Sequence, residues 1–202
     1  MAVFDLCVIT QAVASQGRGH ADVARAALLG GARMIQFREK SMSTLALFET
    51  AKQIRDLTRK HGATFIVNDR VDVAMASEAD GVHLGKEDLP IGIARHILGK
   101  DALIGASVNS PEEAEAAVAA GASYLGVGPV YSTSTKADAG EAVGLRPIIE
   151  IKRVVSVPVL AIGGITCDNM REPLDAGADG IAVISAVAWA EDMVKATKTL
   201  RP

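Results

Sequence analysis

The sequence has few of the residues that staple small extracellular folds or bind metals through sulfur. Only two cysteines occur among its 202 residues, Cys7 and Cys167, and they form neither a disulfide framework nor a metal-ligand spacing. Aromatic residues make up only 3% of the chain, and much of its apolar content is Ala and Val. Such side chains suit close packing of helices on a sheet. We therefore expect two reduced thiols in a cytoplasmic protein.

The charge and the lengths of the apolar runs exclude two further classes of protein. The net charge of −3 argues against a nucleic-acid partner, because a nucleic-acid surface needs an excess of basic residues. No apolar run approaches the length of a membrane span, which excludes a membrane partner. The N-terminal stretch has no basic region and is interrupted by Asp5, which argues against a signal peptide. Small molecules remain as partners, and the choice between monomer and homo-oligomer stays open.

Short apolar runs alternate with helical patterns along the whole chain. The runs are mostly continuous, as is typical of strands buried on both faces of a parallel sheet. The stretches between them are amphipathic or rich in Ala. Residues 44–61 form the clearest predicted helix, and residues 111–120, 168–176 and 187–200 are the other predicted helices. We predict strands at residues 6–10, 34–37, 64–67, 81–84, 102–106, 124–127, 158–162 and 180–184.

The dipeptide Gly-Ala marks several junctions between a predicted helix and the next strand, at residues 31–32, 62–63, 121–122 and 177–178. A glycine there can cap the helix in the left-handed conformation, and the strand then starts at once. The repeated units, with no Pro/Gly/Ser-rich linker between them, predict an α/β fold: a single (β/α)8 TIM-barrel domain over residues 1–202. A doubly wound open sheet is the structural alternative.

Polar residues gather after the predicted strands. In a barrel, the C-terminal ends of the strands converge on one mouth, where active sites are built. This convergence is stronger support for a site than any single motif. The residues concerned are Gln36, Arg38, Lys40, Asn68, Asp69, His83, Asp88, Ser107, Thr133, Thr135, Lys136, Gly163, Gly164 and Ser185.

The segment after the second predicted strand is the most strongly charged of these. Strand alternation puts Gln36, Arg38 and Lys40 on one face, and Phe37 and Glu39 on the other. An amide, a guanidinium and an ammonium on one face suit a polyanion such as diphosphate. A solvated cluster of charges at a strand end is the alternative.

Two acidic residues suggest a site for a hard cation. Asp69 and Asp88 follow neighbouring strands, and two carboxylates with substrate phosphate oxygens are a usual way to hold Mg²⁺. The alternative is that each Asp caps the helix that follows it. Residues 132–144 form a long polar loop in which Lys136 can stabilise a departing phosphate, unless the loop is merely flexible.

Glycines and a serine near the last two strands fit a phosphate cradle. Gly163 and Gly164 follow the seventh strand and Ser185 follows the eighth, where this fold binds phosphate. A simple tight turn is the alternative. We expect His83 to be a hydrogen-bonded core or rim residue without a catalytic role, and His20 to lie on the surface.

Five motifs in this order resemble the thiamine phosphate synthase family. They lie at residues 36–40, 67–69, 79–85 together with Asp88, 128–136 and 162–165, so the resemblance covers essentially the whole chain. It implies a transferase. The reaction would condense 4-amino-2-methyl-5-hydroxymethylpyrimidine diphosphate with a (carboxy)thiazole phosphate. The products would be thiamine phosphate and pyrophosphate, formed by a dissociative reaction assisted by Mg²⁺.

The resemblance also implies a role for each matching residue. Asp69 and Asp88 would hold Mg²⁺. The thiazole would contact Thr133, Ser134 and Thr135, and its phosphate would bind Gly164, Ile184 and Ser185. The residues that would bind the pyrimidine diphosphate are Gln36, Arg38, Lys40, Asn68, Ser107 and Lys136. Three of these, Arg38, Ser107 and Lys136, would also be catalytic.

The sequence departs from the family pattern at Ser132, where the family usually has Pro. Two related readings compete with the synthase: a thiazole tautomerase, which needs no diphosphate and metal site, and a non-catalytic regulator that binds a thiazole phosphate. The basic residues together with Asp69 and Asp88 speak against the tautomerase. A sugar-phosphate epimerase would need facing acid and base groups, and no such pair can be assigned.

Overall fold

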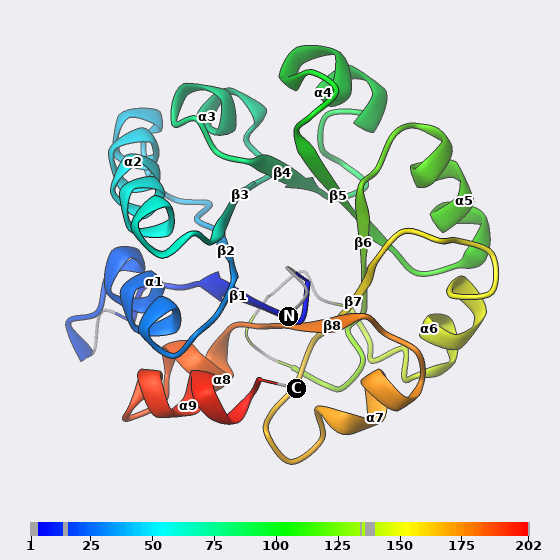
Figure 1. Ribbon diagram of the computed structural model, residues 1–202. Coiled ribbons are helices and arrows are strands. Elements are labelled where there is room, and N and C mark those ends of the chain that lie inside the picture. Colours follow the sequence, from blue (N-terminus) through cyan, green and yellow to red (C-terminus); the bar gives the residue numbers. More distant parts are fainter. Residues whose placement is uncertain (1–3, 14–15, 134, 136–139, 202) are drawn as a thin grey trace.

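The strands of the computed structural model, which describes residues 4–13, 16–133, 135 and 140–201, close into a barrel (Figure 1). Each strand pairs in parallel with the next, and the eighth pairs with the first. The α/β barrel is therefore confirmed, and the open sheet is wrong. In order, the strands are β1 (Leu6–Thr10), β2 (Met34–Phe37), β3 (Thr64–Asn68), β4 (Gly81–Leu84), β5 (Leu103–Val108), β6 (Tyr124–Val127), β7 (Val159–Ile162) and β8 (Gly180–Val183).

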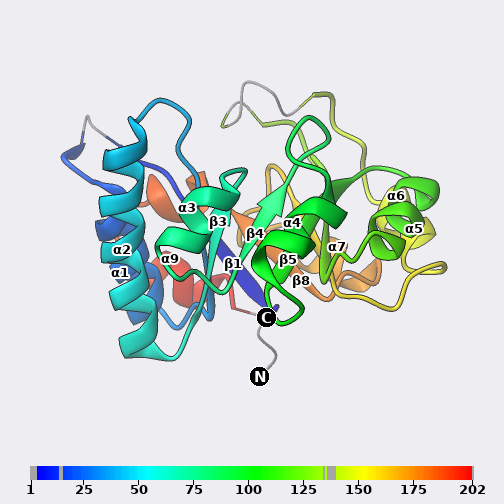
Figure 2. The same ribbon diagram turned by 90° about the horizontal axis from the view of Figure 1, so that it is seen from above.

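Helices surround the barrel on its outer side (Figures 1 and 2). Within the described part of the chain, no helix is long and apolar enough to cross a membrane. The helices are α1 (His20–Leu29), α2 (Thr44–His61), α3 (Val71–Ala76), α4 (Ile91–Leu98), α5 (Pro111–Ala119), α6 (Arg146–Ile151), α7 (Arg171–Asp175), α8 (Ser185–Ala188) and α9 (Met193–Thr199).

Capping residues explain where the helices begin and end. The Ser43 hydroxyl accepts a hydrogen bond from the Ala46 N–H at the start of α2, and Gly62 ends this helix in the left-handed conformation. The prediction of a single helix over residues 187–200 was wrong, because a new helix begins after Asp192. Its side chain accepts from the Lys195 N–H and separates α9 from α8.

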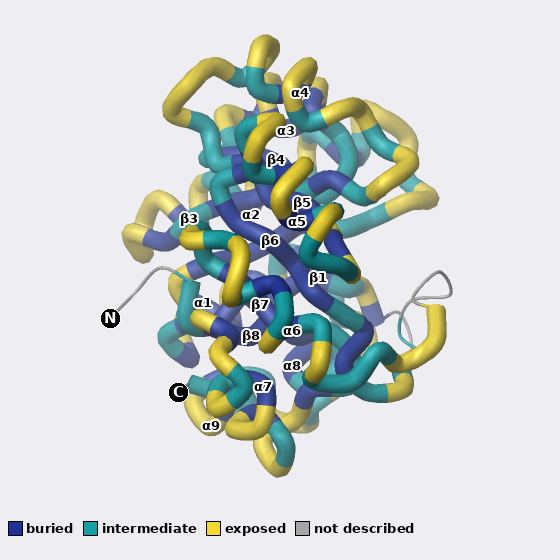
Figure 3. Tube along the Cα trace, turned by 90° about the vertical axis from the view of Figure 1, so that its right-hand side faces the viewer, coloured by how far each residue is buried: buried dark blue, intermediate teal, exposed yellow. Residues whose placement is uncertain are grey.

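The core has two layers, one inside the barrel and one between the strands and the helices. Both faces of each strand are therefore buried, which explains the continuous apolar runs. Figure 3 shows the buried strands and the exposed outer sides of the helices. The inner layer consists of Cys7, Ile9, Met34, Ile66, Tyr124, Leu160 and Ala182.

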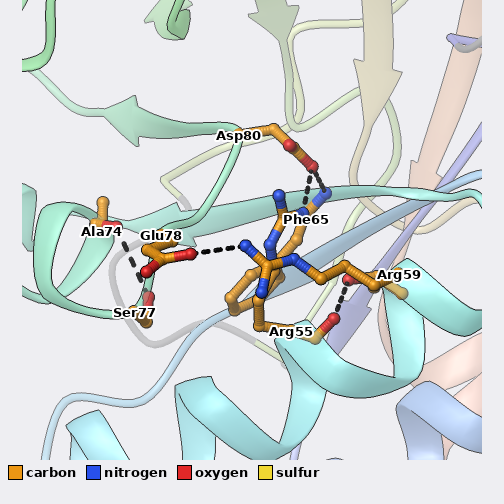
Figure 4. Close-up of polar contacts among 8 residues, drawn as sticks. Arg55, Arg59, Phe65, Ala74, Ser77, Glu78 and Asp80 are labelled. Carbon is orange, nitrogen blue, oxygen red and sulfur yellow. Dashed lines mark hydrogen bonds and ion pairs between the residues drawn. The ribbon is translucent and has the colours of Figure 1, made fainter.

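A polar side chain just ahead of a strand fastens the N-terminal ends of neighbouring strands. Before β4, the Asp80 carboxylate accepts hydrogen bonds from the Phe65 N–H of β3 at 2.7 Å and from the Arg55 guanidinium of α2 at 2.8 Å (Figure 4). Asp179 before β8 and Ser123 before β6 also each accept from a backbone N–H and a basic side chain. We call these contacts strand clasps. They hold the end of the barrel opposite the mouth.

The backbones of β4 and β5 approach each other so closely at Gly81 that only glycine fits. A Cβ atom at this position would lie 1.8 Å from the carbonyl oxygen of Leu103, its partner in β5. Because backbone cannot yield as a side chain can, Gly81→Ala should lower the free energy of unfolding by about 3 kcal/mol in urea titrations. Gly92→Ala is the matched control: its Cβ meets only an atom at 4.0 Å, and it should stabilise α4 by about 0.5–1 kcal/mol. Equal stability of Gly81→Ala and the unchanged protein would contradict the close approach.

Candidate active site

A pocket of about 390 Å³ lies where the C-terminal ends of the strands converge. Gln36 lies below it and lines a small cavity of about 30 Å³ inside the barrel. Ser134 and Lys136 lie outside the residues that the structure describes. The other predicted site residues all line the pocket: Arg38, Lys40, Asn68, Asp69, Asp88, Ser107, Thr133, Thr135, Gly164, Ile184 and Ser185.

The end of β2 presents two different faces. Arg38 and Lys40 line the pocket, and the Gln36 side chain, 3% exposed, lies beneath them in the barrel. On the other face, Phe37 packs in the outer layer of the core, and the Glu39 carboxylate lies 3.2 Å from Nε2 of His20 in α1. The strand thus directs its cationic groups to the pocket and its acidic group to the helix layer.

Asp69 and Asp88 come together in the pocket. Both carboxylates line it, and burial first, and then the neighbouring Asp88, raise the pKa of Asp69 to about 6. Lys40 Nζ lies 3.9 Å from an Asp69 oxygen. Neither Asp caps a helix: α3 and α4 have Arg70 and Pro90 at their caps. The alternative of two separate helix caps is therefore wrong.

Backbone conformation and backbone hydrogen bonds hold Asp69 and Asp88 in position. Asp69 has a φ of 62°, in the left-handed region, and its N–H donates to the His83 carbonyl at 2.8 Å. Among L residues, Asp and Asn tolerate this conformation best. The Asp88 carboxylate accepts from the Gly85 N–H at 2.7 Å within the turn after β4. Both acidic groups are thus held by backbone contacts of β4 and its loop.

The opposite wall of the pocket contains the glycines after β7 and the start of α8. Gly164 has a φ of 65°, and a Cβ there would lie 2.7 Å from Cβ of Tyr131. The Thr135 hydroxyl donates to Ser185 Oγ at 3.1 Å, which ties the loop after β6 to the first residue of α8. Small groups and hydroxyls therefore gather on this wall.

His20 contradicts its predicted place on the surface. The residue is buried, with its ring nitrogens 2.9 Å from Thr10 Oγ1 and 3.2 Å from Glu39, and its ring meets Phe37 edge-on. Burial lowers the pKa of His20. The helical spacing to the buried Val23 was the signal that places His20 on the inner face of α1.

His83 and Tyr124 are two polar groups of the site for which no role was predicted from the sequence. His83 lines the pocket; its Nδ1 lies 3.1 Å from the Tyr124 hydroxyl and its Nε2 lies 3.0 Å from Ser107 Oγ. Tyr124 is fully buried in the inner layer of the core. In the sequence it stands inside an apolar run, where a buried hydroxyl gives no separate signal.

Fold and site together define a class: parallel (β/α)8 barrels with a charged pocket at the C-terminal ends of the strands. Residues 6–187 match the family described as thiamine monophosphate synthase. The chain belongs to this family.

Individual relatives agree along nearly the whole length. A thiamine-phosphate synthase of Chloroflexus aurantiacus is 50% identical over 196 residues, which cover 97% of this chain and 90% of the relative. One of Methanospirillum hungatei is 49% identical over 193 residues, covering 96% and 94%. The solved thiamine phosphate pyrophosphorylase of Pyrococcus furiosus has a TM-score of 0.90 and 48% identity, covering 98% of this chain and 94% of that one. The family and the transferase class predicted from the motifs are confirmed.

The hydrogen bonds of Glu39 with His20 and Ser41 should make the stability of the fold depend on pH. Burial opposes the ionisation of Glu39, but hydrogen bonds from Ser41 and His20 outweigh burial and lower the pKa to about 2. A lowered folded pKa adds stability above the ordinary value of 4.5, and this stability is lost as the pH falls toward 2. We expect Glu39→Gln to lower the free energy of unfolding by about 1–2 kcal/mol at pH 7.

The same difference should shrink between pH 4.5 and pH 3, as measured by urea titrations at each pH. Glu49→Gln, at an exposed position of α2, is the control and should show no difference at either pH. A difference for Glu39→Gln that stays constant over this range would show that the charge of Glu39 is not what stabilises the fold.

Proposed function

We propose that this pocket joins the pyrimidine diphosphate to the thiazole phosphate, giving thiamine phosphate and pyrophosphate. The observation that carries the proposal is the contact between Asp69 and Asp88 in the same pocket as Arg38 and Lys40. A diphosphate leaving group is highly charged, and groups that neutralise it in place lower the barrier to its departure.

The two walls of the pocket suit the two substrates. Arg38, Lys40, Asn68 and Ser107 would bind the pyrimidine diphosphate, with Gln36 below them at the ring. The opposite wall would take the second substrate. There Thr133 and Thr135 would contact the thiazole, and Gly164, Ile184 and Ser185 would bind its phosphate. Ser134 and Lys136, on the same loop as Thr133, complete the proposed set.

The acidic pair fits Mg²⁺. Two carboxylates in contact disfavour each other's charge, and the raised pKa of Asp69 reflects this cost together with that of burial. Mg²⁺ is commonly held by one or two carboxylates plus phosphate oxygens, whereas a site made by protein alone needs more ligands. The described residues contain no cluster of three or more His, Cys, Asp or Glu that would form such a site. We propose that Asp69 and Asp88 hold Mg²⁺, which would neutralise charge on the diphosphate.

The chemistry requires no covalent nucleophile from the protein. The C–O bond to diphosphate would break first, leaving a pyrimidine-methyl cation stabilised by the amino group of its ring. The thiazole nitrogen then attacks this carbon. Arg38, Lys40 and Lys136 would hold the departing diphosphate, and the loop at residues 132–144 would keep water from the cation. The reaction would take place in the cytoplasm, as two cysteines that form no disulfide suggest.

The first experiment tests the reaction itself. The purified protein is mixed with both substrates, with and without Mg²⁺, and thiamine phosphate and pyrophosphate are measured by chromatography. We expect equal amounts of the two products, and their loss when the metal is chelated. Binding of thiazole phosphate without turnover would favour a regulator. Conversion of the thiazole alone, independent of Mg²⁺, would favour a tautomerase.

The second experiment removes charge at the acidic pair. Asp69→Asn keeps the shape of the side chain and tolerates the left-handed backbone, so the fold should survive. We expect kcat to fall on the order of 100-fold, as when a group that stabilises developing charge is lost. Lys136→Ala should reduce kcat similarly.

Asp72→Asn is the matched control for the acidic pair. Asp72 lies on α3 and pairs with Arg70 outside the pocket, so its substitution should leave kcat unchanged. Wild-type rates in both Asp69→Asn and Lys136→Ala would overturn the proposed neutralisation of the leaving group.

A further inference from the structure

A line of polar side chains crosses the inside of the barrel beneath the pocket. His83 of β4 and Tyr124 of β6 are both in register with Gly105 of β5, which stands between them. A Cβ on Gly105 would lie 2.3 Å from His83 Nδ1 and 2.4 Å from the Tyr124 hydroxyl oxygen. The missing side chain in β5 is therefore what lets the histidine and the tyrosine meet.

A second glycine leaves room on the other side of the imidazole. A Cβ on Gly126 of β6 would lie 3.1 Å from Cε1 of His83. Gly126 is also in register with Ser107, whose Oγ lies 3.0 Å from Nε2 of His83. The ring is thus held in a slot between two glycines, with one nitrogen toward Tyr124 and the other toward Ser107.

The contact between Gln36 and Tyr124, at the buried end of this line of side chains, determines which groups donate and which accept. Gln36 makes a side-chain hydrogen bond to the Tyr124 hydroxyl, while its own Oε1 has no partner among the residues that the structure describes. Gln36 therefore donates through its amide nitrogen to the oxygen of Tyr124. The fully buried hydroxyl must then give its hydrogen to an acceptor, and Nδ1 of His83 is 3.1 Å away.

This direction fixes the tautomer of His83. A neutral imidazole that accepts at Nδ1 carries its hydrogen on Nε2, so it donates to Ser107 Oγ. Ser107 is exposed to the pocket, and an oxygen that already accepts from the histidine keeps its own hydrogen for another partner. Phosphate oxygens accept hydrogen bonds and do not donate them when ionised, so a donor hydroxyl matches them.

We propose that Tyr124 is a positioning residue: through His83 it makes the Ser107 hydroxyl a donor to the diphosphate of the bound substrate. The proposal rests on the proposed function, because that function places a diphosphate in front of Ser107. Tyr124 touches no substrate. Its hydroxyl determines which ring nitrogen of His83 carries the hydrogen. It therefore also determines that Ser107 accepts a hydrogen bond from the histidine and does not donate one to it.

The tautomer can be measured without any substrate. Two-bond ¹H–¹⁵N spectra of ¹⁵N-labelled protein at pH 7 distinguish the ring nitrogen that carries hydrogen from the one that does not, and His83→Gln assigns the signal. We expect a neutral His83 with hydrogen on Nε2. In Tyr124→Phe we expect a mixture of tautomers. A wild-type ring with hydrogen on Nδ1, or on both nitrogens, would overturn the proposal even if the Tyr124→Phe variant does not fold.

Kinetics of pyrophosphate release test whether Tyr124 acts through Ser107. We expect Tyr124→Phe to reduce kcat roughly 10-fold, the scale at which residues that orient a functional group act. In a Ser107→Ala background the same change should cost nothing further, because the group being positioned is already gone. An equal loss in both backgrounds would show that Tyr124 acts independently of the serine, and would overturn the proposal.

The control variant is Ser77→Ala, which removes a buried hydroxyl group elsewhere in the protein. Ser77 donates to the Val73 carbonyl at 2.7 Å at the end of α3, and its side chain lines neither cavity. Figure 4 shows its weaker contact with the Ala74 carbonyl. Ser77→Ala should keep the wild-type rate and the wild-type tautomer. If the wild-type protein makes no thiamine phosphate, the proposed function fails, whereas the spectra still decide whether Tyr124 fixes the histidine.

Discussion

The parallel pairing of β8 with β1 is the constraint on which the pocket depends. The two strands pair from Leu6 with Ile181 to Val8 with Val183, and this seam closes the ring. It requires glycine at position 180, since a Cβ there would lie 1.8 Å from the Phe4 carbonyl oxygen. Without closure, β8 would lie at one edge of an open sheet and β2 next to the other edge. Arg38 and Ser185 could then not line the same pocket.

The two ends of the barrel have different tasks. The side chains of the strand clasps at Asp80, Ser123 and Asp179 accept hydrogen bonds from backbone N–H groups and from basic side chains in or next to the helices. At the mouth, side chains such as Arg38 and Ser107 instead face a pocket. Polar residues before the strands thus stabilise the barrel, while those after the strands remain available to a ligand.

The sequence predicted the strands well because burial on both faces gives an unmistakable pattern. It predicted the pocket residues because the ends of parallel strands must converge once the barrel closes. It could not predict contacts that depend on register across strands, such as the meeting of Tyr124 and His83 over Gly105. The break between α8 and α9 was also missed, since Asp192 in a helical pattern can be either a surface residue or a cap.

The strand clasps have a consequence for the order in which the chain folds. The clasp at Asp80 joins groups only from α2, β3 and the approach to β4, so it can form as soon as this stretch has left the ribosome. The seam between β1 and β8 joins the two ends of the chain, and its loop-closure entropy is correspondingly large. Local modules therefore assemble early, and the catalytic mouth comes into existence only with the last strand.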